Sequence, residues 1–118
     1  MYADCYVIPI PKKSIPAYRK LASIAAKVWQ EHGALDYKEC VGDDLSTHCG
    51  LPFPKLAQLK RSESVIFAWI VYKSKAHRDR VNSKVMVDPR IASIAPETMP
   101  FDVKRMTYGG FKVLVAAK

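Results

Sequence analysis

The chain has 118 residues, of which 49% are hydrophobic and 25% are charged, and its formal net charge is +8. These values are ordinary for a globular domain, no apolar run approaches the roughly 18 residues of a membrane span, and the first residues lack a signal-peptide pattern. We therefore expect a single cytoplasmic domain over residues 1–118. The basic residues are spread over every segment, which is typical of a solvated surface, so we expect neither a nucleic-acid nor a membrane partner.

The first expected elements are a strand over residues 2–10 and a helix over residues 14–32. Pro9 closes the strand because proline cannot donate a ladder hydrogen bond. Ser14 is a suitable N-cap for the helix, and Gly33 supplies its C-terminal stop. The apolar positions that recur with helical spacing are Ile15, Tyr18, Ala22, Ala25 and Trp29.

A charged strand is expected over residues 34–42, because "ALDYKECVG" alternates an apolar face with a partly polar one, as edge strands do. A long connection over residues 43–62 follows, and within it "KLAQLK" predicts one or two helical turns. Connections of this length are often functional or form a dimer arm.

The three cysteines are Cys5, Cys40 and Cys49, and none of them form a C-x-x-C pair. We therefore expect no disulfide framework and no metal site. Cys5 and Cys40 lie in strand-like runs and are predicted to be buried thiols.

The third strand, "ESVIFAWIVY" over residues 63–72, is apolar on both faces. Side chains alternate across a strand, so one face carries four residues and the other face the next four. The first set is Val65, Phe67, Trp69 and Val71. The second set is Ile66, Ala68, Ile70 and Tyr72. Which set meets the helices is left open by the pattern.

A second helix is expected from Ser74, its N-cap, to about Val87, with Val81 and Val85 on its inner stripe. Pro89 disfavours a further helical turn at the residue before it, so residues 89–103 are predicted to be a loop. A fourth strand is expected over residues 105–116. Its Gly109–Gly110 pair predicts a bulge or a close backbone approach.

The resulting order, βαββαβ, is the ferredoxin-like arrangement, an α+β fold with a four-stranded antiparallel sheet and both helices on one face. The second face of the third strand would then lie open in a monomer. Four such side chains represent about 6–12 kcal/mol of burial free energy, which rivals the stability of a whole domain, about 5–15 kcal/mol. We therefore predict a homodimer in which the sheet faces of two copies cover each other.

Three stretches, "GALDYKECVGDD", "VIFAWIVYKSKAHRDRVNSKVMVDPR" and "MPFDVKRMTYGGF", closely resemble the YbaA-like family, a bacterial family of unknown function. The resemblance spans nearly the full chain. It implies the dimeric α/β-barrel superfamily, in which two sheets face each other and the helices lie outside. The superfamily includes cofactor-independent monooxygenases, isomerases and stress-related binding proteins, and fold analogy does not choose among them.

His77 is the leading candidate for a ligand contact or an acid–base group, because it lies on the stripe of Val81 and would point between helix and sheet. The alternative is a histidine at the edge of the core that is held by one hydrogen bond. Trp69 and Tyr108 could form a pocket wall, as could Tyr6, or they could simply belong to the core.

Arg105 is a second candidate, since it could clamp a carboxylate ligand bidentately or pair with Glu39 or Asp102. Asp43 could act with Asp44 as an acid–base pair, or cap backbone amides. No cofactor motif is present, so no cofactor is expected. The sequence thus predicts a protein that binds a small, anionic metabolite between sheet and helices, or alternatively a cofactor-independent enzyme that uses His77 or a nearby carboxylate as base.

Overall fold

The computed structural model describes residues 1–117 and contains one sheet with the strand order β2-β3-β1-β4, in which all neighbours are antiparallel. The strands are β1 (Tyr2–Pro11), β2 (Asp36–Val41), β3 (Glu63–Tyr72) and β4 (Thr107–Lys112). The two long helices are α1 (Ile15–Glu31) and α3 (Lys75–Met86). The short ones are η1 (Lys12–Ser14), α2 (Phe53–Leu56), α4 (Pro89–Ala92), η2 (Pro96–Thr98) and η3 (Val103–Arg105). The predicted ferredoxin-like fold is confirmed.

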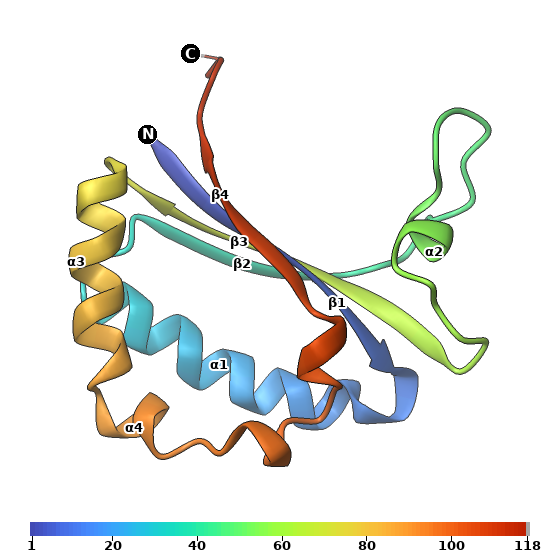
Figure 1. The fold of residues 1–118 in the computed structure, drawn as a ribbon, viewed down its shortest axis with the longest axis horizontal. Coiled ribbons are helices and arrows are strands. Elements are labelled where there is room, and N and C mark those ends of the chain that lie inside the picture. The colour runs from blue at the N-terminus through green and yellow to red at the C-terminus, as the bar shows by residue number, and fades with distance from the viewer. Residues whose placement is uncertain (118) are drawn as a thin grey trace.

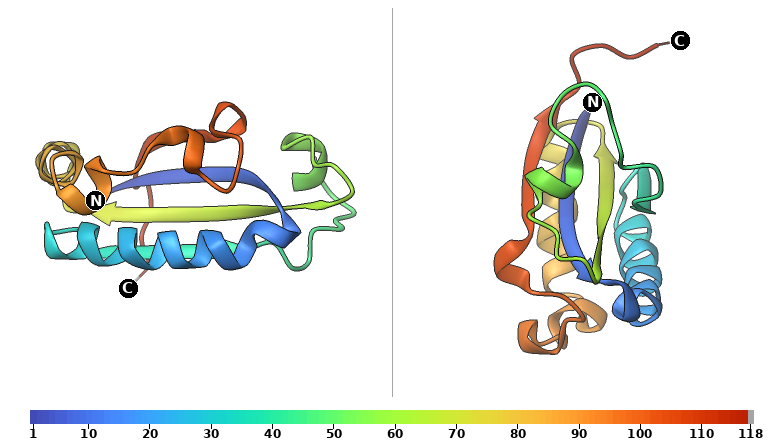
Figure 2. Two further views of the ribbon diagram at one scale, coloured as in Figure 1. Left: turned by 90° about the horizontal axis from the view of Figure 1, so that it is seen from below. Right: turned by 90° about the vertical axis from the view of Figure 1, so that its right-hand side faces the viewer.

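The long helices cover one face of the sheet and leave the other face open (Figure 1). Figure 1 views the sheet along its edge, with α1 and α3 on one side and the segment around α2 rising on the other. Figure 2 shows the same layers from two further directions. No helix in the described part of the chain has the length and apolar character needed to cross a membrane.

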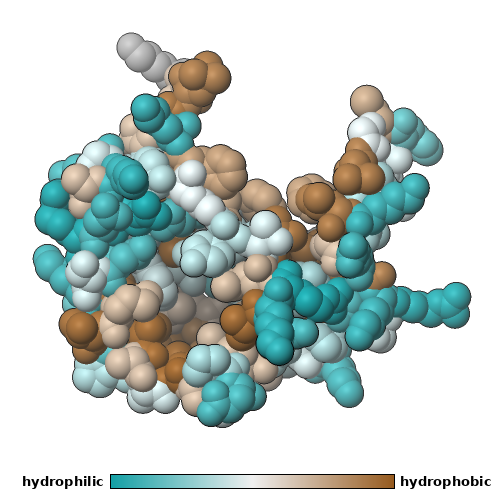
Figure 3. Space-filling model, viewed as in Figure 1, coloured by the Kyte–Doolittle hydropathy of each residue, from teal (hydrophilic) through white to brown (hydrophobic). Residues whose placement is uncertain are grey.

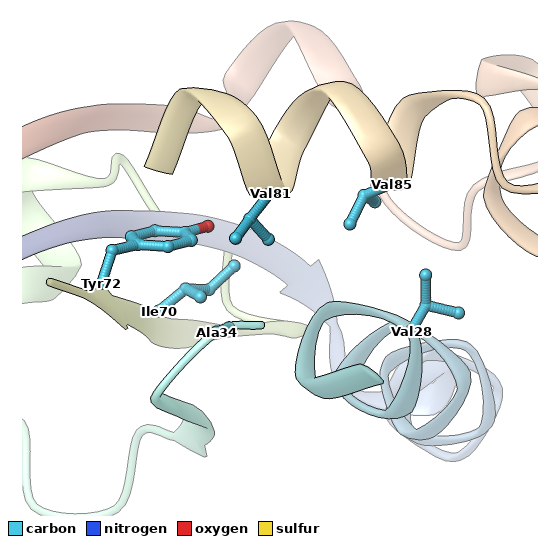
Figure 4. Close-up of a cluster of buried hydrophobic side chains, with 6 residues drawn as sticks. All are labelled: Val28, Ala34, Ile70, Tyr72, Val81 and Val85. Atoms are coloured by element: carbon cyan, nitrogen blue, oxygen red, sulfur yellow. The ribbon is translucent and has the colours of Figure 1, made fainter. Parts of the chain in front are cut away.

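The alternation along β3 decides which of its faces meets the helices. The set Ile66, Ala68, Ile70 and Tyr72 is buried, and the core clusters gather around it. Figure 4 shows Ile70 and Tyr72 facing Val81 and Val85 of α3, with Val28 of α1 nearby. On the other side of β3, Phe67 is 36% exposed. The open face is therefore the one that carries Val65, Phe67, Trp69 and Val71.

The second long helix follows its prediction closely. Ser74 accepts a hydrogen bond from the His77 backbone N–H at 3.1 Å, which satisfies one of the free donors of the first turn. Val81 and Val85 are buried. At the start of α1, by contrast, the Ser14 side chain makes no capping hydrogen bond, because η1 already supplies a helical turn there.

The prediction of a loop over residues 89–103 was wrong. Pro89 begins α4 rather than preventing a turn, because proline fits the first helical position and Asp88 caps it by accepting from the Arg90 N–H at 3.0 Å. The helices η2 and η3 follow in the same segment. In the long connection, the helical turn is α2, which begins earlier than "KLAQLK" indicated.

The fourth strand is shorter than predicted, since β4 ends at Lys112 and residues 113–117 extend beyond the sheet. A close approach, the second of the two predicted alternatives, explains the glycine pair. A Cβ on Gly110 would lie 2.7 Å from Cε2 and 2.8 Å from Cζ of Tyr2, whereas a Cβ on Gly109 would have only Phe111 nearby, at 3.9 Å. The Tyr2 ring thus occupies the space that a side chain at Gly110 would need.

Candidate functional site

A cavity of about 380 Å³, here called the inner cavity, lies between α1, the helix-covered face of the sheet and the segment from α4 to η3. Its size falls in the range of small-molecule sites, about 300–1,000 Å³. The cavity exists because the inner stripe of α1 carries Ala22 and Ala25 between the bulky Tyr18 and Trp29. Small side chains at sheet-facing positions leave space that larger ones would fill.

A carboxylate lies in the wall of this apolar space. The Tyr18 hydroxyl donates to Glu39 Oε1 at 2.5 Å, and the Tyr37 hydroxyl donates to Glu39 Oε2 at 2.7 Å. We call these three residues the Glu39 trio. Period-two alternation places Tyr37 and Glu39 on the helix-covered face of β2, where Tyr18 reaches them from α1.

Burial, together with the Glu39 carboxylate, raises the pKa of both trio tyrosines above the ordinary value of 10.0. Their hydroxyls therefore stay protonated and serve as donors at neutral pH. Tyr6 also lines the inner cavity, and burial followed by the charge of Asp4 raises its pKa as well. Its ring stacks on that of Tyr108 with centroids 5.7 Å apart.

A second cavity, the outer groove, lies along the other flank of α1 beside the edge strand β2 and has a volume of about 400 Å³. Its lining includes Arg19, Ser23 and Ala26 of α1, which do not line the inner cavity. Four residues line both spaces: Tyr18, Ala22, Tyr37 and Glu39. The Glu39 trio thus lies where the two cavities adjoin.

The five residues predicted as ligand contacts do not come together, and none lines either cavity. His77 accepts a hydrogen bond on Nδ1 from the Lys73 N–H at 2.9 Å and packs edge-on against Tyr72, which matches the alternative of a histidine at the core edge. Trp69 lies on the open face and donates to Asp36 at 3.3 Å. Tyr108 is 66% exposed, and Asp43 is exposed in the connection after β2.

Arg105 binds a carboxylate bidentately, but that carboxylate is Glu63, at 2.6 and 3.0 Å, and not Glu39 or Asp102, the two protein partners that the sequence suggested. Its guanidinium also donates to the backbone oxygen of Gln58 at 2.9 Å. These contacts tie the beginning of β4 to the beginning of β3. Asp102 caps η3 through the Lys104 N–H instead of pairing with Arg105.

The prediction of buried thiols was wrong for Cys40 and only partly correct for Cys5. Cys40 is exposed on the open face, not buried, and Cys5 is half-buried there. Among residues 1–117, no group of three or more histidine, cysteine, aspartate or glutamate side chains is placed to hold a metal ion. The Glu39 trio was missed, although the alanines within the α1 stripe and the alternation of Tyr37 with Glu39 were visible signals.

The arrangement favours an uncharged group within the inner cavity, because no lysine or arginine lines it. Each Glu39 oxygen accepts one tyrosine hydroxyl and keeps a further lone pair for a donor on a ligand. The aromatic and methionine side chains around it suit an apolar or aromatic body. The site can therefore hold an apolar molecule and orient it through one polar point.

Comparison with known proteins places the chain among relatives of unassigned function. A family model described as a protein of unknown function, DUF1428, matches residues 1–103. The chain is 40% identical over 114 residues to the uncharacterized protein YbaA of Escherichia coli strain K12, which covers 97% of each chain. The YbaA protein of Shigella flexneri matches equally well.

Two solved structures share the fold at low sequence identity. An uncharacterized NIPSNAP domain protein from Burkholderia xenovorans superimposes with a TM-score of 0.61 at 11% identity, over 100% of this chain and 99% of that one. Protein Atu4242 from Agrobacterium tumefaciens superimposes with a TM-score of 0.58 at 17% identity, over 95% and 92%. At these identities the likeness concerns the fold alone.

Proposed function

The chain belongs to the DUF1428 family of proteins of unknown function, and from that premise we propose that it is a small-molecule-binding protein whose ligand occupies the inner cavity. The ligand is a small molecule with an uncharged, largely apolar body. The Glu39 trio supplies its polar contact. We further propose that the protein acts in the cytoplasm as a homodimer.

The Glu39 carboxylate in an otherwise apolar wall carries this proposal. Glu39 is half-buried, so its carboxylate has lost part of its water, and two tyrosine hydroxyls compensate that loss. A plain core would be more stable with apolar residues at these three positions. Binding sites for small molecules are usually apolar cavities with a few polar groups in the wall, as the Glu39 carboxylate is here.

The binding proposal can be tested with 4-tert-butylphenol, an uncharged molecule with an apolar body and one hydroxyl donor. The two tryptophans provide a built-in control, because Trp29 lines the inner cavity while Trp69 lies on the open face. In a titration followed by NMR, we expect the indole N–H signal of Trp29 to shift and that of Trp69 to stay. An unchanged Trp29 signal at saturating probe would contradict the proposal.

Ala25→Phe should abolish this shift, because the new ring fills the inner cavity. Ala17→Phe is the matched control, since Ala17 lies on the exposed side of the same helix. The thermal unfolding of both variants should be measured alongside, to show that each is folded. If the probe still shifts the Trp29 signal in a folded Ala25→Phe protein, the inner cavity is not the site.

The open face supports the dimer. Phe67 and Trp69 of β3 lie there, and Phe53 from α2 packs edge-on against Phe67 with ring centroids 6.1 Å apart. Phe111 of β4 is 57% exposed on the same face, and Leu114 beyond it is 95% exposed. Figure 3 shows hydrophobic side chains at the C-terminal end and around α2, on both sides of the hollow between them. A second copy would cover this apolar surface.

The enzymatic alternative assigns Glu39 as a general base. It draws support from the position of a carboxylate at the wall of a largely apolar cavity. His77 is less suited to that role, since its Nδ1 already accepts the Lys73 N–H. Turnover that Glu39→Gln abolishes, with binding of the same compound retained, would distinguish an enzyme from a binding protein.

A further inference from the structure

The inner cavity and the outer groove adjoin beneath α1, and this contact has a consequence for the class of ligand. Both spaces are lined by Tyr18, Ala22, Tyr37 and Glu39, so these side chains form a wall that the two cavities share. We propose that they form one continuous site for a single-chain amphiphile with an anionic head, whose chain lies in the inner cavity and whose head lies in the outer groove. This inference rests on the proposed function for the inner cavity and names the ligand class, with Arg19 rather than the Glu39 trio as the group that meets the polar end of the ligand.

The shape of the junction favours a narrow chain. The ligand would pass below α1 at Ala22, which has the smallest side chain of the four shared residues. An alkyl chain is narrower than a fused ring system and therefore suits a passage between these side chains better. Both oxygens of Glu39 already accept a tyrosine hydroxyl, so a chain that passes the trio leaves no carboxylate oxygen without a partner.

The two ends of the site differ in polarity. The inner cavity is lined by apolar side chains of α1, the sheet and the α4–η3 segment, with no cation among them. The outer groove has Arg19 and Ser23 at the exposed flank of α1. Lys38 also borders the groove, but its ammonium group is bound to Asp36. Arg19 is therefore the cation that would meet an anionic head.

Dodecanoate, kept below its micelle concentration, is a suitable probe, and dodecan-1-ol is its uncharged counterpart. The neighbouring alanines form a matched pair, because Ala26 lines only the outer groove and Ala25 only the inner cavity. Ala26→Phe should weaken dodecanoate binding by about tenfold or more, since each displaced methylene loses its burial. It should leave 4-tert-butylphenol binding unchanged. Ala25→Phe should abolish the binding of both probes.

Arg19→Gln should weaken dodecanoate binding about two- to fivefold, the effect of one exposed ion pair, and leave dodecan-1-ol unaffected. Unchanged dodecanoate affinity in Ala26→Phe, or equal losses for acid and alcohol in Arg19→Gln, would overturn the inference. If the Ala26→Phe protein does not fold, Ser23→Leu takes its place. Ser23 also lines only the outer groove, and leucine is a smaller obstruction than phenylalanine. If the wild-type protein binds the phenol but fails these tests, only the ligand class is wrong; if it does not bind the phenol, the inner-cavity proposal itself fails.

Discussion

Asp4 of β1 is the one charged residue that is buried as a whole residue among residues 1–117, at 3% exposure, and its partner comes from α3. Arg78 donates to its carboxylate at 2.7 Å and also lies over the Tyr2 ring, 5.0 Å from the centroid. Burial raises the pKa of Asp4, while the Arg78 charge works against that shift. The pair thus joins the central strand to the helix at the cost of desolvating two charges.

Arg78→Ala should destabilise the protein by about 3 kcal/mol or more, because it leaves the Asp4 carboxylate buried without its cation. Asp79→Ala is the matched control. Asp79 accepts from the same guanidinium at 2.8 Å, but its side chain is 61% exposed. Its loss should cost about 0–1 kcal/mol. Chemical denaturation measures the loss of unfolding free energy in both variants. Equal losses would show that the buried contact with Asp4 contributes no more to stability than the exposed contact with Asp79.

The deficit of Arg78→Ala should depend on pH in a definite direction. Without the arginine, the folded-state pKa of Asp4 rises further above the ordinary value of 3.8, since the lowering charge is gone. The stability of the variant is then reduced at pH values above that raised pKa and recovers as the pH falls through it towards 3.8, because the carboxyl is protonated in both states only below the ordinary pKa. Unfolding curves of variant and wild type should converge as the pH is lowered from about 7 to about 4. A constant gap would contradict this account.

For single residues, the sequence predicted the kind of contact better than the partner. Arg105 was expected to bind a carboxylate, on a ligand or on Glu39 or Asp102, yet the carboxylate that it binds is Glu63. The partner depends on where β3 and β4 begin relative to each other, which no local pattern contains. The Glu39 trio was missed for the same reason, since Tyr18 and Glu39 are brought together only when α1 packs on β2.

The elements themselves were largely predictable, because each long helix and strand carries its own periodicity, and α3 also carries its own cap. The Ser74 cap and the buried Val81 and Val85 are examples. The structure of the segment after Asp88 was not predictable, since a proline is compatible with both a loop and a first helical turn. Which one forms depends on tertiary contacts, here the hydrogen bond at 2.9 Å between Nε2 of His32, at the end of α1, and Asp88.

The packing of Tyr2 on β4 provides a prediction at the level of elements. Gly110→Ala should destabilise the protein by about 1–3 kcal/mol, because its Cβ would overlap the Tyr2 ring and displace it from Arg78. Gly109→Ala, one residue earlier in the same strand, meets only the Phe111 ring at an ordinary contact distance of 3.9 Å and should be nearly neutral. If the thermal unfolding temperatures of the two variants fall equally, strand propensity rather than the close approach explains the glycines.

The open face of the sheet determines how the whole molecule should behave in solution. If two copies bury this face, Phe67→Lys places an unpaired charge in the interface and should shift the protein from dimer to monomer. Ile24→Lys is the control, since Ile24 is a comparably exposed apolar residue on α1, away from the open face. Sedimentation velocity resolves the two states. A wild-type protein that is monomeric at every concentration would remove the dimer from the proposed function.

The sequence predicted that one face of β3 would stay uncovered within one chain, but not which face, because both are apolar. The helices settled it, since α1 and α3 present their apolar stripes to the side of Ile66 and Ile70. The cavity could not be predicted in the same way. Its volume depends on how far α1 stands from the sheet, which Tyr18 and Trp29 set by their size.

The central position of β1 shapes how the chain is assembled during synthesis. Its neighbours in the sheet are β3 and β4, the two strands that emerge last from the ribosome. Such long-range pairing slows folding and leaves apolar strands transiently without partners. Until residues 107–112 have appeared, one edge of β1 has no companion, and the preceding segment with Phe101 and Met106, which line the inner cavity, is not yet anchored to the sheet by β4. A nascent chain stalled before β4 should therefore be a target for chaperones, while the completed chain is not.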